Sequence, residues 1–283
     1  KVRMILNDPD GNLPDDLVLA DLPTVQSLLS RTGELNRVEV VISQLDRRED
    51  SAYLARIENR LRKELPENLS LELKYAPDNV WMGLNQASPR LSDIRVRQAI
   101  LKAIDVDAIL DGAYFGVAER AHGPVSKGLL GYREEAPAGR DVDGAKKLID
   151  AAGASGTTIT LDTLADADFL TGAQIVQANL AEIGVNLVIE SHEGGSFWSL
   201  VSTKGKEGID MNFNRWLAPP DLSWTTQWLL SSQAGIWNWQ WFESKEFDDL
   251  HFAALGETDN VKRAQMLMNL QQMLDDSACY LWI

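Results

Sequence analysis

Hydrophobic and polar residues alternate with two different periods along most of the chain, and together they predict an α/β fold. Short β-branched or alternating runs are typical of strands, and apolar residues that recur every three or four positions are typical of helices. Strands are predicted at residues 38–42, 69–75, 80–84, 157–161, 185–189 and 211–213. Helices are predicted after Asp93, after Asp105 and at residues 46–65, 141–153, 169–183, 195–201, 245–255 and 261–274. This order of elements implies a mixed, at least partly parallel sheet flanked by helices.

Polar residues and glycines mark the ends of several predicted helices. Asp93, Asp105 and Asp141 each precede an apolar stripe, where an aspartate side chain can accept hydrogen bonds from the unpaired N–H groups of the first turn. Gly153 follows the stripe that begins after Asp141, at the position where a left-handed residue is favoured. The stretch Gly116–Arg140 is punctuated by glycine and proline, which predicts a long surface excursion.

The first 36 residues show little periodicity and differ from the rest of the chain. Residues 7–16 (NDPDGNLPDD) consist largely of turn formers, so we expect a loop there. Some of its polar residues faintly resemble a calcium-binding loop, but the glycine falls too early and no closing glutamate follows at the required position. We therefore predict a loop-rich flanking segment at residues 1–36 and a single lobe at residues 37–283.

The acidic charge balance argues against two classes of partner. The chain has 42 acidic and 27 basic residues, a net charge of −15, and no basic stripe. Nucleic acids and anionic membrane surfaces are therefore not expected to bind it. No stretch approaches the roughly 18 apolar residues that a membrane-spanning helix needs, so we expect no direct membrane insertion.

Two further features bear on the compartment and on covalent chemistry. The first residue is Lys1 rather than methionine, so we expect a processed or truncated piece, with any signal peptide outside this chain. The one cysteine, Cys279, cannot form an intrachain disulfide or a multi-cysteine zinc site. It lies in an apolar run near the end, where we expect a small buried hydrophobic residue.

A search for catalytic and metal-binding patterns is negative. The chain has no G-x-S-x-G, S-x-x-K, H-E-x-x-H, G-x-G-x-x-G or phosphate-binding-loop motif. Its three histidines, His122, His192 and His251, fall in three separate predicted elements and lack the spacing of a metal-binding helix. We therefore predict no catalytic residues, no metal site and no cofactor, and hence a protein that is not an enzyme.

Tryptophan is unusually concentrated in one part of the chain. Six of the nine tryptophans lie between Trp216 and Trp241. In residues 237–241 (WNWQW) the indoles alternate with amides, which in an extended segment places three rings on one face and two amides on the other. The pattern alone allows a buried core face or a wall that binds a ligand. Trp224 and Trp228, four residues apart, are expected to pack in a helix.

A series of short motifs resembles one protein family. Asn85 precedes the segment PRLSDIRVRQAI at residues 89–100, and AID follows at residues 103–105. Further motifs follow in the same order, at residues 116–124, 131–132, 141–153, 247–250 and 259–274. Together they closely resemble the peptide/nickel-type (family 5) extracytoplasmic solute-binding proteins of ABC importers, over the chain from about residue 37 to the end.

The resemblance implies a fold, a function and a compartment. Members of this family have two α/β lobes of the periplasmic-binding-protein type II kind, joined by a hinge and closing on a solute. This chain resembles the C-terminal, distal lobe. The implied function is capture of a peptide or another small solute in the periplasm and its delivery to ABC permease membrane subunits. Two alternatives are a ligand-sensing module of a transcription regulator and, less favoured, an enzyme.

The resemblance also implies which residues contact the solute. The family's ligand-facing strand ends in W-x-x-D, which residues 214–221 match at Trp216, whereas the acid that binds a peptide α-amino group is replaced by Pro219. Arg215 is a candidate for binding a ligand carboxylate, with a surface salt bridge as its alternative. The expected ligand contacts are Asn214, Arg215, Trp216, Asp221, Trp237, Asn238, Trp239 and Trp241.

Overall fold

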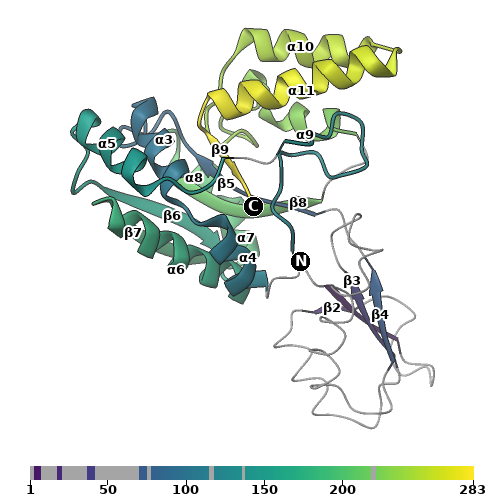
Figure 1. The fold of residues 1–283 in the computed structure, drawn as a ribbon, viewed down its shortest axis with the longest axis horizontal. Helices are drawn as coiled ribbons and strands as arrows, with labels where there is room; N and C mark the ends of the chain where they lie inside the picture. Colours follow the sequence, from purple (N-terminus) through teal and green to yellow (C-terminus); the bar gives the residue numbers. More distant parts are fainter. Residues whose placement is uncertain are drawn as a thin grey trace. The chain divides into compact units, whose positions relative to one another are not determined.

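The computed structural model describes residues 3–7, 18–20, 37–41, 70–74, 78–114, 118–135, 138–217 and 221–283. These residues fall into two compact units, which we describe separately (Figure 1). The smaller unit comprises residues 1–78 with 114–119, and the larger comprises residues 79–113 with 120–283. The predicted helix at residues 46–65 lies outside the described residues, as does nearly all of the loop predicted at residues 7–16.

The smaller unit contains a four-stranded sheet with the order β2-β1-β3-β4. Its strands are β1 (Arg3–Asn7), β2 (Val18–Ala20), β3 (Arg37–Val41) and β4 (Ser70–Lys74). Strand β1 is antiparallel to β2 and β3, and β3 is parallel to β4. The predicted strands at residues 38–42 and 69–75 are confirmed. Strand β1 lies before the predicted domain boundary at residue 36 and pairs with β3, which lies after it. The predicted boundary itself stays a prediction.

The larger unit contains a mixed five-stranded sheet with the order β7-β6-β8-β5-β9. Its strands are β5 (Asp78–Leu84), β6 (Thr158–Leu164), β7 (Asn186–His192), β8 (Met211–Leu217) and β9 (Tyr280–Trp282). Strand β6 pairs in parallel with both β7 and β8, whereas β5 and β9 pair with each other in antiparallel orientation. The predicted fold class, a partly parallel sheet within an α/β lobe, is confirmed. Strand β9 was not predicted, because three residues are too few to show a period.

Helices flank this sheet and form a second layer at one end of it (Figure 1). The helices are α3 (Ile94–Ala103), α4 (Val106–Tyr114), α5 (Val142–Ala152), α6 (Ala167–Glu182), α7 (Gly194–Trp198), α8 (Leu200–Lys204), α9 (Ser223–Thr226), α10 (Lys245–Gly256) and α11 (Asn260–Asp276). Helix α6 packs on β6, β7 and β8, α3 packs on α5, and α10 packs on α9 and α11. None of the described helices is long and apolar enough to cross a bilayer.

The helix ends agree with the capping pattern in the sequence. The side chains of Asp93, Asp105 and Asp141 accept hydrogen bonds of 2.8–3.0 Å from backbone N–H groups in the first turns of α3, α4 and α5. Gly153 ends α5 with a φ of 65°, in the left-handed region that glycine adopts at low cost. The single helix predicted at residues 195–201 is wrong, because the chain forms two short helices that meet at Ser199.

Arg97 is a buried structural arginine of α3. Its side chain is 4% exposed. Its guanidinium donates hydrogen bonds to the backbone carbonyl oxygens of Leu91 (2.7 Å), Ser92 (3.1 Å) and Ser277 (2.9 Å). It thereby connects the start of α3 to the segment before β9, where the predicted burial of Cys279 is confirmed.

Asp221, an expected ligand contact, forms an ion pair with Arg263. Its two carboxylate oxygens accept hydrogen bonds of 2.7 and 3.0 Å from the Arg263 guanidinium of α11. One of them also accepts from the Ser223 N–H at the start of α9 (2.9 Å). Arg263 in turn donates to the Ala254 carbonyl of α10 (2.9 Å). The Arg263 hydrogen bond lowers the pKa of the Asp221 carboxyl to about 2. Through these hydrogen bonds the pair connects helices α9, α10 and α11.

We expect Arg97→Gln to destabilise the protein far more than Arg95→Gln. The first substitution leaves buried carbonyl groups without their charged donor, which costs about 3 kcal/mol. The second removes an exposed ion pair with Asp93, which solvent screens, so the loss of stability should be small. Urea unfolding of both variants measures the difference. Equal losses would contradict the structural role of Arg97.

We expect Asp221→Asn to make stability less dependent on pH in the acid range. Because the folded-state pKa lies below the ordinary value of 3.8, the ion pair stabilises the protein above about pH 4 and is lost as the pH falls toward 2. The variant should therefore be less stable by about 1–2 kcal/mol at pH 7, and the difference should vanish near pH 2. Thermal unfolding at several pH values measures this, with the exposed residue Asp150 changed to Asn as a control. An unchanged difference at low pH would refute the assignment.

Candidate functional site

The carboxyl ends of the parallel strands β6, β7 and β8 lie at the same end of the larger sheet, and a cleft lies there. Strand β6 is in register with β7 and β8, so Thr163 lies beside Ser191 on one side and beside Phe213 on the other. In parallel sheets this edge is where the loops that bind ligands leave the strands. The cleft has a volume of about 330 Å³ and is lined by Leu164, Ala165, Asp166, Glu193, Gly194, Trp198 and Arg215.

Arg215 is the expected ligand contact that lines this cleft. Its guanidinium lies 5.4 Å from the centre of the Phe169 ring. Its nearest carboxylates are long contacts, 3.5 Å to Asp166 and 3.6 Å to Asp168. Burial lowers the pKa of the Arg215 guanidinium, because desolvation disfavours the charged form. Burial, and then the neighbouring Asp166, raise the pKa of Asp168 to about 6.

Trp216 follows Arg215 in β8 and packs elsewhere, since successive side chains of a strand point to opposite faces. Its ring meets Trp81 edge to face, with centroids 5.7 Å apart. It also contacts Trp237, at 6.3 Å. Trp237 is 40% exposed and lies 6.4 Å from Trp198 of the cleft. We call Trp198, Trp216, Trp237 and Trp239 the indole cluster, because their rings form a connected series that reaches the cleft at Trp198.

Residues 237–241 do not form the extended segment in which the alternating indoles and amides would lie on opposite faces. This segment is a series of turns in which the N–H groups of Trp237 and Asn238 both donate to the Gln233 carbonyl. Trp239 is 3% exposed, and its indole N–H donates to the Ile236 carbonyl (3.0 Å). Trp241 has a φ of 47°, which turns the chain again. Strand periodicity therefore does not determine where these three indoles point.

The two expected asparagine contacts are buried. Asn238 is wholly buried, and its side chain donates to the carbonyls of Leu229 (3.1 Å), Leu230 (3.3 Å) and Phe242 (2.7 Å). It also accepts a hydrogen bond from the Phe242 N–H (3.1 Å). This amide organises the surrounding turns from inside the protein. Asn214 of β8 is 2% exposed, on the same side of the strand as Trp216.

The two tryptophans expected to pack in a helix behave differently from each other. Trp228 contacts Trp237, with ring centroids 5.6 Å apart. Trp224 is 63% exposed, so the prediction that it packs inside is wrong. The physical reason is that α9 ends at Thr226 and a 3₁₀ turn follows, which breaks the spacing that places residues four apart on one helix face.

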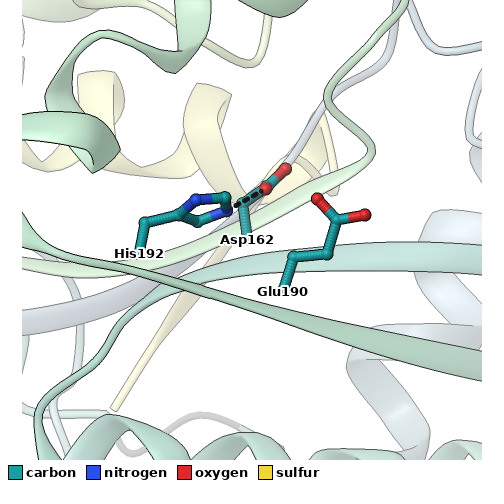
Figure 2. A group of neighbouring side chains, drawn as sticks. All are labelled: Asp162, Glu190 and His192. Atoms are coloured by element: carbon teal, nitrogen blue, oxygen red, sulfur yellow. Dashed lines mark hydrogen bonds and ion pairs between the residues drawn. The ribbon is translucent and has the colours of Figure 1, made fainter.

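Beside the cleft, Asp162, Glu190 and His192 gather at the ends of β6 and β7 (Figure 2). His192 Nε2 lies 2.7 Å from Asp162 Oδ1, and the three groups are close enough to hold one metal ion. However, the Lys204 ammonium of α8 lies 2.7 Å from both Asp162 and Glu190. Its hydrogen bond lowers the pKa of Glu190. Because a lysine already supplies the positive charge, we interpret this group as an ion-pair network between β6, β7 and α8.

Of the expected contacts, the structure brings Arg215 to the cleft and Trp216, Trp237 and Trp239 to the adjoining indole cluster. Sequence reasoning missed Trp198, Asp166 and Glu193. Asp166 and Glu193 follow the ends of predicted strands within five residues, which was the available signal, whereas Trp198 had none. A guanidinium, two carboxylates and an indole around one cleft can bind a polar solute through ion pairs and ring contacts.

Comparison with known proteins gives a family. The model of the bacterial extracellular solute-binding proteins, family 5 Middle, matches residues 19–238. The dipeptide-binding protein of Escherichia coli K12 is 26% identical over 234 residues, which are 80% of this chain and 43% of that protein. The glutathione-binding protein GsiB of the same strain is 24% identical over 220 residues, 74% of this chain and 43% of that protein. The chain thus spans less than half the length of these relatives.

Solved structures agree with this result. The periplasmic binding protein DppA of Helicobacter pylori, solved with the peptide STSA, has a TM-score of 0.64 and 26% identity, covering 72% of this chain and 41% of that one. The substrate-binding protein CtaP of Listeria monocytogenes has a TM-score of 0.67 and covers 83% of this chain and 51% of that one; at 19% identity it shows the fold alone. By its family match and its fold, this chain belongs to family 5 of the bacterial extracellular solute-binding proteins.

Proposed function

We propose that this chain is the distal, C-terminal lobe of a two-lobed protein that captures a solute for an ABC-type importer. The observation that carries the proposal is the cleft at the carboxyl ends of β6, β7 and β8, which Arg215 and Trp198 both line in a chain of this family. The solute is a peptide, a peptide-like compound or another small molecule, since the relatives are named for binding dipeptides and glutathione. Capture takes place in the periplasm, before delivery to the permease subunits.

The mechanism is closure of a clamp around the solute. A solute that contacts both lobes stabilises the closed state, because only that state makes both sets of contacts. The permease then recognises the closed form. The protein changes no covalent bond in this process, so its cycle consists of binding, closure and release.

In this lobe we assign direct contact to Arg215, Trp198 and Trp237. Trp198 and Trp237 are 38% and 40% exposed, so part of each side chain is accessible to a solute. The buried Trp239 contacts Trp198, and Trp216 contacts Trp237. We leave out four residues of the sequence-based set. Asn214 and Asn238 are buried, Asp221 is held by Arg263, and the Trp241 ring packs over the Gly235 backbone.

We expect Trp198→Ala to weaken solute binding about 10-fold, the effect of losing one ring contact. The measurement is a titration with alanyl-leucine followed by the NMR signals of the indole N–H groups. Trp224→Ala is the matched control, because that indole is exposed on α9 and does not line the cleft. Equal weakening by the two variants would contradict the assigned surface.

We expect the 283-residue chain to bind dipeptides with a Kd of about 1 mM or weaker. One lobe makes only part of the contacts and leaves much of the solute in water, so the cost of immobilising the solute is poorly offset. Isothermal titration calorimetry measures this affinity. Micromolar binding by this chain would show that a second lobe is not needed.

A further inference from the structure

Asp162, Glu190 and His192, none of which lines the cleft, have the composition and spacing of a metal-binding group (Figure 2). Asp162 of β6 is in register with Glu190 of β7, and His192 follows two residues later on the same face of β7. We call these three residues the carboxylate–histidine group. Their ligand atoms lie within 4.8 Å of one another, and no other such group of three is found among the described residues. Ligand atoms around a tetrahedral zinc ion are about 3.3 Å apart, so small side-chain rotations would complete the coordination.

The second carboxylate oxygen of Asp162 is a separate sign that this group has room for a further ligand. Asp162 has no exposed surface, and its Oδ1 lies 2.7 Å from both His192 Nε2 and the Lys204 ammonium. Its Oδ2 is buried and has no hydrogen-bond partner among the described residues. A buried carboxylate oxygen without a donor is costly. An ion that binds this carboxylate through Oδ2, or through both oxygens, removes that cost.

The Lys204 ammonium marks the position of a cation at the ends of the two strands. It lies 2.7 Å from Asp162 Oδ1 and 2.7 Å from Glu190 Oε2. Two carboxylates and one ammonium leave one negative charge unbalanced beside a neutral imidazole, and a divalent ion in place of the ammonium would cancel it. Lys204 is the last residue of α8 and has 24% of its side chain exposed. Its flexible stem can therefore carry the ammonium out to water.

We propose that the carboxylate–histidine group binds a divalent transition-metal ion of the zinc class, which displaces the Lys204 ammonium. The three side chains supply three ligands, and water completes a four-coordinate shell. The imidazole favours zinc over magnesium or calcium, which prefer oxygen ligands alone. His192 coordinates through Nε2, so the neutral ring carries its proton on Nδ1. The ion-pair network described above is then the metal-free state, and the proposal does not depend on the identity of any solute.

A bound ion would cross-link β6 to β7 and release the end of α8 from both strands. The sequence-based expectation of no metal site rested on the spacing of histidines within one helix. This group takes its ligands from two strands, with Asp162 28 residues before Glu190, so that spacing does not reveal it.

Titration of zinc chloride into the 283-residue chain by isothermal titration calorimetry tests the proposal. We expect one ion to bind per chain in the micromolar range. The melting temperature should rise with zinc concentration, because a ligand that binds the folded state alone stabilises it by mass action. Magnesium chloride at the same concentrations should cause no such rise.

Single substitutions identify where the ion binds. His192→Gln and Glu190→Gln each remove one ligand and should weaken zinc binding at least about 10-fold. Glu190 is 44% exposed, so its substitution should leave the fold intact. Lys204→Met removes the competing ammonium and should strengthen binding about 10-fold. His122→Gln is the matched control and should change nothing, since His122 is the other partly exposed histidine and its Nδ1 lies 2.9 Å from the Arg133 carbonyl oxygen.

Three outcomes would overturn the proposal. The first is an absence of zinc binding by the wild-type chain up to about 1 mM. The second is binding by Lys204→Met alone, which would mean that the lysine excludes metal from the native protein. The third is equal binding by the wild type, His192→Gln and Glu190→Gln, which would identify an adventitious ion elsewhere on the acidic surface. Weakening in both ligand variants with an unchanged control would support it.

Discussion

The parallel pairing of β6 with both β7 and β8 is the constraint on which the candidate site depends. Because the three strands run in one direction, the segments that follow them leave the sheet at a single edge. Asp166 and Glu193 lie in the segments after β6 and β7, and Arg215 lies near the end of β8, so the shared direction brings together three residues that are far apart in the sequence. A reversed neighbour would carry its polar residues to the opposite edge. The chemistry of the cleft is thus a result of strand direction more than of any local motif.

Close packing beneath the sheet sets the position of the same residues. Phe213 and Arg215 are two residues apart in β8 and so share a face, and Phe169 of α6 contacts both. Gly172 permits the approach of α6, because a Cβ atom there would lie 2.7 Å from the Phe213 ring. The aromatic contact in the core and the guanidinium at the rim are therefore consecutive parts of one helix–strand interface.

The fold was predictable wherever local signals and packing agree. Asp93, Asp141 and Gly153 mark helix ends through hydrogen bonds and dihedral angles that depend on neighbouring residues alone. The family motifs supplied what periodicity does not contain, namely membership of the solute-binding family.

The site was less predictable, because its residues meet through tertiary contacts. The alternation at residues 237–241 suggested a strand, but the turn hydrogen bonds to Gln233 determine the backbone there. Asn238 was predicted to contact a ligand, but its side-chain amide donates hydrogen bonds to surrounding backbone carbonyls. Trp198 escaped notice, since one tryptophan after a strand carries no pattern. Lys204 donates a hydrogen bond to Asp162, which is 42 residues away in the sequence, and no rule of local spacing predicts such a pair.

The contrast between the Lys204 network and Arg215 has a consequence for the response to ionic strength. Asp162 has no exposed surface, and its bond to Lys204 is short, so dissolved ions hardly reach this pair. The contacts of Arg215 are longer and open to the cleft, where counter-ions enter. If the cleft binds a charged solute, as proposed, concentrated salt should therefore weaken that binding while it leaves the ion pairs of the sheet intact. Solute affinity and architecture would then respond differently to the salinity of the surroundings.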